Sequence, residues 1–179
     1  DAGMAGIGEL AVYGAGFDMD ALPALAEVMA LCETRGAPLL LHANEPVGHL
    51  YPGKAPMGLA GLYAFLEAYP RNRVVLAHWG GGLFFYRLLK REVRTVLQNV
   101  WFDTAASPFL YDPAIYRIAA EIAGADRILF GSDYPLIQPD RYLRELSGAG
   151  LSEEALGMVT GGNAEKLFTS APPGPPSPP

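Results

Sequence analysis

Short apolar runs alternate along this chain with longer segments of helical periodicity, and this alternation constrains the fold more than any other feature. Such a pattern predicts parallel strands joined by crossover helices, which is an α/β fold. The runs are nearly continuous in apolar residues, as expected for strands that are covered on both faces. The predicted strands are residues 7–12, 38–42, 74–78, 100–103 and 128–130.

Helical segments separate these strands and have recognisable ends. The first follows Asp18 and Asp20, either of which could cap it, has Pro23 in its first turn and ends at Gly36. The other predicted helices are residues 58–69, 83–97, 113–123 with Asp112 as cap, 141–146, a stretch after the cap Ser152, and 163–168.

The composition predicts one globular domain over residues 1–169. Half of the 179 residues are hydrophobic and 18% are charged, which is enough apolar material for one buried core. The segment 170–179 is rich in proline and is predicted to be an extended, disordered tail. Cys32 lies on the apolar face of a predicted helix, so we expect a buried thiol in a reducing, cytoplasmic environment.

The charge balance argues against several classes of partner. A net charge of -6 and a pI near 5.0 provide no basic surface for nucleic acid or for an anionic membrane. No apolar run approaches the roughly 18 to 20 residues of a membrane-spanning helix. The expected partner is therefore a small-molecule substrate.

Residues of types that bind metal or act in catalysis lie at the ends of the predicted strands. His42, His78 and Asp103 each end a strand, and Asp133 follows the fifth. The carboxyl ends of parallel strands open on one mouth, so these side chains should converge there. Imidazole and carboxylate groups are ligands for zinc or a similar divalent ion. Alternatively, each histidine serves only packing, and Asp103 only caps or braces a loop.

Segments near these strand ends offer candidates for substrate contact. The loop 43–56 contains Asn44, Glu45, His49, Tyr51 and Lys54 and could act as a binding lid, although His49 and Lys54 could also be simply solvated. A further candidate is Trp79, directly after His78. The glycines 80–82 allow either close approach to a ligand or a tight turn. The aromatic residues Phe84, Phe85, Tyr86, Phe109 and Tyr111 are expected in the core.

Four strand-end motifs together resemble the amidohydrolase-related family. They are His-Ala-Asn-Glu-Pro-Val-Gly-His from His42, Leu-Ala-His-Trp-Gly-Gly-Gly from Leu76, Phe-Asp-Thr-Ala-Ala-Ser-Pro from Phe102, and Leu-Phe-Gly-Ser-Asp-Tyr-Pro from Leu129. The resemblance extends over about residues 6–168 and implies a (β/α)8 TIM barrel, here a partial barrel of about strands 4 to 8. It also implies that His42 and Asp133 bind metal, that His78 and Asp133 are catalytic, and that the metal is zinc or manganese. Glu9 matches the family's fourth strand and is a candidate for substrate contact, or else an ordinary hydrogen-bonded glutamate at a strand end.

The chain departs from that family in its first strands. It has no His-x-His pair of metal ligands and no room for three earlier strands, because a closed barrel typically has about 250 residues. We therefore expect a fragment, which the start at Asp1 favours, or a homo-oligomer in which a second chain covers the open edges. The predicted function is a metal-dependent hydrolase of a small organic substrate. The alternatives are a non-oxidative decarboxylase and a non-catalytic or oligomerising partial barrel.

Overall fold

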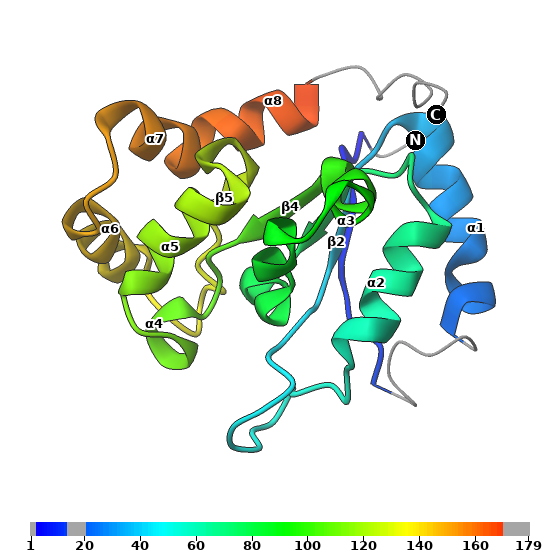
Figure 1. Cartoon of the computed structure of the whole chain (residues 1–179), viewed down its shortest axis with the longest axis horizontal. Helices are drawn as coiled ribbons and strands as arrows, with labels where there is room; N and C mark the ends of the chain where they lie inside the picture. The colour runs from blue at the N-terminus through cyan, green and yellow to red at the C-terminus, as the bar shows by residue number, and fades with distance from the viewer. Residues whose placement is uncertain (1–2, 14–20, 170–179) are drawn as a thin grey trace.

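The structure is a computed structural model that describes residues 3–13 and 21–169. Five parallel strands form one sheet in sequence order, which confirms all five predicted strands, each of them as short as its prediction or shorter (Figure 1). The strands are β1 (Ile7–Leu10), β2 (Leu39–Leu41), β3 (Val74–Leu76), β4 (Val100–Asp103) and β5 (Ile128–Leu129).

Helices connect successive strands, as a right-handed parallel arrangement requires. The α-helices are α1 (Ala21–Arg35), α2 (Leu59–Ala68), α3 (Arg91–Val96), α4 (Ser107–Leu110), α5 (Ala114–Ala123), α6 (Pro139–Gly148), α7 (Glu153–Gly157) and α8 (Asn163–Thr169). Three segments, η1 (His78–Leu88), η2 (Leu97–Asn99) and η3 (Ala125–Arg127), are 3-10 helices, and η4 (Met158–Gly162) is a π-helix. Among the described residues no helix is both long enough and apolar enough to cross a bilayer.

Two predicted helix starts are confirmed by side-chain capping. The Ser152 hydroxyl accepts a hydrogen bond from Ala155 N at 3.1 Å, and Asp112 accepts one from Ala114 N at 2.9 Å. The cap predicted at Asp18 or Asp20 and the tail 170–179 lie outside the described residues.

The single helix expected over residues 83–97 is wrong. Trp79 and the glycines 80–82 have positive φ, so the chain turns tightly before η1 continues to Leu88. Leu89 and Lys90 are then extended, with ψ near 176° and 177°, and this break separates η1 from α3. Hydrophobic periodicity alone does not register such a break, because apolar residues continue across it.

The strand residues divide between two faces in the period of two that a pleated sheet imposes. Leu39, Leu41 and Leu76 are fully buried in the main core beneath the helices, where Cys32 is also buried as predicted. On the other face Leu40 and Val75 pack with residues of α8. That helix lies at the amino-terminal end of the sheet, and the opposite end is left open for a site (Figure 1).

Gly81 provides a test of the tight turn after β3. Its φ is +61°, and a Cβ there would lie 2.4 Å from the backbone oxygen of Asn44, whereas Gly82 has φ +95° with nothing within 4 Å. We expect Gly82→Ala to lower the free energy of unfolding by about 1–2 kcal/mol, the cost of a left-handed residue. Gly81→Ala should lose at least about 3 kcal/mol, since a backbone atom must also move. Urea unfolding measures both, and equal losses would contradict this packing.

Candidate metal centre

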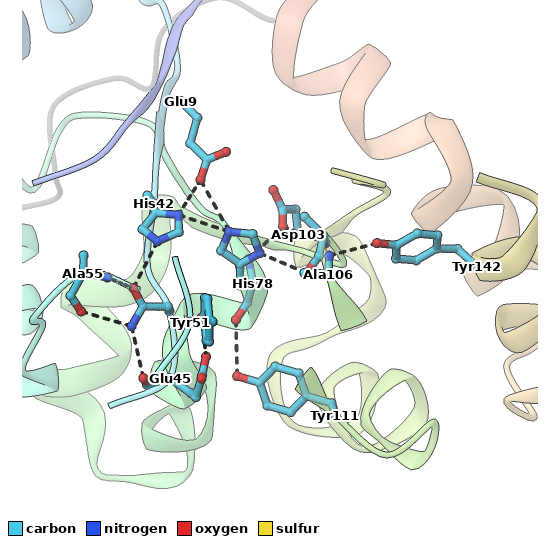
Figure 2. Close-up of polar contacts among 12 residues, drawn as sticks. Glu9, His42, Glu45, Tyr51, Ala55, His78, Asp103, Ala106, Tyr111 and Tyr142 are labelled. Atoms are coloured by element: carbon cyan, nitrogen blue, oxygen red, sulfur yellow. Dashed lines mark hydrogen bonds and ion pairs between the residues drawn. The ribbon is translucent and has the colours of Figure 1, made fainter. Parts of the chain in front are cut away.

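Three side chains meet at the open end of the sheet. Glu9 lies on β1, His42 follows β2 and His78 follows β3. Figure 2 shows them pointing at one another. Glu9 Oε1 lies 2.8 Å from His42 Nδ1 and 3.5 Å from His78 Nε2, and the two ring nitrogens are 3.1 Å apart. The three could hold one metal ion, since their ligand atoms all lie within 4.8 Å of one another.

Asn44 determines which ring nitrogen of His42 faces Glu9 and His78. Its Oδ1 accepts the Ala55 N–H at 2.7 Å, and its Nδ2 donates to the carbonyls of Ala55 and Glu45, so the amide orientation is fixed. His42 Nε2 lies 3.0 Å from the same Oδ1 and must therefore be the donor. In the neutral imidazole the lone pair then lies on Nδ1, which faces Glu9.

His78 is oriented by a backbone carbonyl. Its Nδ1 lies 3.0 Å from the oxygen of Ala105, and because a carbonyl only accepts, this nitrogen carries the proton. The neutral ring therefore presents the lone pair of Nε2 to Glu9 and His42. Two imidazole lone pairs and one carboxylate are a donor set suited to a divalent metal, and each imidazole is fixed by a second contact of its ring.

Without a metal, protons hold this group together. The hydrogen-bonding contacts of Glu9 with the rings of His42 and His78 lower the pKa of Glu9 to about 2. Burial disfavours the charged form of His78, but the Glu9 hydrogen bond and the nearby Asp103 outweigh it and raise the pKa of His78 to about 9. Near neutral pH the cluster thus contains a carboxylate and a protonated His78, and a cation would replace that proton.

Asp103 holds the backbone next to the site through hydrogen bonds. Its Oδ1 accepts hydrogen bonds from the backbone nitrogens of His78 and Ala105, at 2.9 and 3.0 Å. Burial raises the pKa of Asp103 to about 6. These bonds hold His78 at a φ of 54°, in the left-handed region. The structure therefore favours the bracing role over direct participation at the mouth.

A pocket of about 750 Å³ opens above the three residues. Its polar lining is Glu9, His42, His49, Tyr51, His78 and Asp133. Its apolar lining includes Tyr13, Phe109, Leu110 and Leu136. The size and the mixture of apolar wall and few polar groups are typical of a small-molecule site.

Asp133 lies on the wall of this pocket and outside the group of three. Its φ is 55°, and its charge contributes to raising the pKa of Tyr51. The sequence paired His42 with Asp133 as metal ligands, but the structure groups His42 with Glu9 and His78 instead. Glu9, expected only as a substrate contact, is thus the more direct neighbour of the histidines.

Two residues predicted to contact substrate are placed elsewhere. Trp79 is 0% exposed, and its indole N–H donates to Ser107 Oγ at 2.7 Å within the core, so it offers no surface to a ligand. The Lys54 ammonium is bonded to Glu45 and to backbone carbonyls of its own loop. His49 and Tyr51, in contrast, line the pocket.

The core placement expected for five aromatic residues is correct mainly for Phe84. Phe85, on η1, and Phe109, on α4, are 57% and 56% exposed, and Tyr86 is also exposed. The Tyr111 hydroxyl donates to the His78 carbonyl at 3.3 Å. Phe109 therefore belongs to the pocket wall rather than to the core.

The site reasoning from sequence missed the role of Asn44, which is completely buried and orients His42. Its position two residues after a strand-end histidine was a usable signal, because a short polar side chain there can reach the ring. Its second partner, Ala55, is eleven residues away and gave no signal.

The chain resembles known proteins in sequence and in fold. The chain is 29% identical to the 6-methylsalicylic acid decarboxylase of Penicillium expansum, over 87% of this chain and 57% of that protein. The crystal structure of the 5-carboxyvanillate decarboxylase of Sphingomonas paucimobilis matches at a TM-score of 0.67 and 17% identity, covering 89% of this chain and 57% of that one. A dihydroxybenzoic acid decarboxylase of Polaromonas, solved with manganese and the inhibitor 2-nitroresorcinol, matches at 0.60 and 22%, covering 85% and 54%.

The chain spans a little over half the length of these proteins. The likeness in fold confirms the predicted class, a partial (β/α)8 barrel. The profile of the amidohydrolase family matches residues 1–169. The chain therefore belongs to the amidohydrolase family, as its strand-end motifs predicted.

Proposed function

We propose that this chain forms the metal-binding half of the active site of a non-oxidative decarboxylase that acts on a small aromatic carboxylic acid. The observation that carries the proposal is the convergence of Glu9, His42 and His78, with their free lone pairs, at the base of a partly apolar pocket. Decarboxylation replaces hydrolysis as the first candidate because the similar proteins described above are decarboxylases.

The ligand set suits either zinc or manganese, because both accept imidazole and carboxylate donors. Bound there, the ion supplies a positive charge that stabilises anionic oxygens of the substrate. Glu9, His42 and His78 would hold the ion. The second contacts of the two histidines, to Asn44 and to Ala105, keep the rings from rotating.

The apolar wall fits the ring of the substrate. Phe109, Leu110 and Leu136 lie on the same pocket as the polar cluster, so a planar ring could pack on them while its carboxylate and hydroxyl oxygens face the cluster. We propose that Asp133, on the wall of this pocket, takes up a proton from water and passes it to the ring carbon. The bond to the carboxylate then breaks, its electron pair restores the aromatic ring, and carbon dioxide leaves.

A turnover assay tests this proposal. The chain loaded with Mn²⁺ or Zn²⁺ is incubated with 6-methylsalicylic acid or dihydroxybenzoic acid, and carbon dioxide release is measured. We expect metal-dependent release that Asp133→Asn lowers at least about 100-fold. Asp140→Asn is the matched control, because that carboxylate is exposed on α6 and pairs with Arg144.

Two other results would point to the alternatives. Cleavage of small amides or lactones without carbon dioxide release would make the protein a hydrolase. The absence of tight metal binding, together with no turnover of either class, would support the non-catalytic partial barrel.

A further inference from the structure

The loop between β2 and α2 is held together by a noncovalent cross-link, which consists of the hydrogen bonds of a single lysine. Lys54 Nζ donates to Glu45 Oε1 at 2.9 Å and to the carbonyls of Val47 and His49 at 2.6 and 3.1 Å. An ammonium has three N–H donors, so all of them are used inside the loop. The Lys54 and Glu45 side chains are only 8% and 16% exposed. Lys54 therefore has no donor left for a substrate.

The same contacts fix two pocket-lining rings. The second oxygen of Glu45 accepts the Tyr51 hydroxyl at 3.1 Å, and the Lys54 ammonium lies 5.5 Å from the centroid of the Tyr51 ring. Burial and the Glu45 charge raise the pKa of Tyr51, so its phenol stays protonated and committed to Glu45. The His49 ring lies 5.6 Å from that of Tyr51, and its carbonyl is one of the lysine's acceptors.

Asn44 connects this loop to the metal centre. It bonds both the backbone N–H and the carbonyl of Ala55, which closes the base of the loop, and it accepts a hydrogen bond from His42 Nε2. None of these bonds uses the side chain of Lys54 or Glu45, so replacing either side chain leaves the contact between Asn44 and His42 in place.

We propose that Lys54 is a positioning residue that holds Tyr51 and His49 as a preformed wall of the pocket, so that the loop selects planar ring ligands before any conformational change. A wall fixed in advance lowers the entropy lost when a ligand binds, and this favours rigid ligands that match it. The choice of an aromatic ligand rests on the proposed function, whereas the cross-link itself does not.

Trypsin cleavage tests the cross-link without metal or substrate. Lys54 is the only tryptic site between Arg35 and Arg71, so cleavage after it reports opening of this loop alone. Glu45→Gln removes the charge that holds the ammonium, and we expect cleavage at Lys54 to accelerate about tenfold. The control Glu121→Gln breaks the exposed pair with Arg117 and should leave this rate unchanged. Equal cleavage of the wild type and Glu45→Gln would overturn the proposal.

Ligand binding tests the selection of rings. In the Mn²⁺-loaded protein we expect both Lys54→Met and Glu45→Gln to weaken salicylate binding about tenfold while the affinity for Mn²⁺ stays the same. If Lys54 instead contacted the ligand directly, Glu45→Gln would free the ammonium and strengthen binding, which would overturn the positioning role. Accelerated cleavage together with no salicylate binding by the wild type would retain the cross-link, but it would overturn ring selection and count against the proposed function.

Discussion

Replacing His42 or His78 with alanine is expected to lower the affinity for Mn²⁺ or Zn²⁺ at least about 100-fold, because each change removes one of three converging donor atoms. Glu9→Gln should have a comparable effect, since the amide is neutral and also carries two N–H donors toward the imidazoles. A competition titration against a chromophoric chelator measures these affinities. Circular dichroism verifies that each variant is folded.

The third histidine provides the matched control. His49 lies on the same pocket but outside the cluster, so His49→Ala should change the metal affinity less than about threefold. Asp133→Ala separates the two possible ligand sets. If Asp133→Ala abolished binding while Glu9→Gln left it intact, the pair His42 and Asp133 that the motifs imply would be correct, and the grouping seen in the structure would not.

The sequence predicts the sheet well because its signal is local. In Leu39–Leu41 and Val74–Leu76 every residue is apolar, and only a strand buried on both faces needs such a run. The positions of His42 and His78 follow from the same logic, since the residue after a buried parallel strand reaches the open end of the sheet. Their approach to within 3.1 Å was thus predictable in outline.

What the sequence does not predict depends on backbone geometry and on distant contacts. Trp79 directly follows His78, yet consecutive residues with φ of 54° and 60° send the two side chains in different directions, one to the pocket and one to the core. The proton positions on His42 and His78 depend on Asn44 and on Ala105, which is 27 residues away from His78 in the chain. No periodicity encodes such contacts.

Glu9 shows the same limit on the first strand. A glutamate near a strand end is ordinarily a solvated or hydrogen-bonded side chain, and nothing in the run Ile7–Leu10 distinguishes it. Its importance follows from the order of the sheet, which places β1 beside β2 and so brings the carboxylate to His42. The ligand set is therefore a property of strand order as much as of residue type.

The affinity for a divalent metal should rise about tenfold per pH unit from pH 7 to about 9 and then level off. A metal requires the lone pair of His78 Nε2, but the pKa of His78 in the metal-free protein is raised to about 9, so below that pH each binding event must displace one proton. Glu9 contributes no proton in this range, because its pKa is lowered to about 2. The protonation of His78 therefore sets the direction of the pH dependence, and the metal affinity falls as the pH is lowered.

Calorimetric titrations in buffers of different ionisation enthalpy measure the proton released per metal bound, and near pH 7 we expect His78 to contribute about one. His78→Gln should bind metal more weakly and lose this contribution, while His49→Ala should retain it. A wild-type affinity that does not change between pH 7 and 9 would mean that His78 is neutral or lies outside the ligand set. In that case the short contacts among Glu9, His42 and His78 would be a hydrogen-bonded cluster beside the metal rather than the place where it binds.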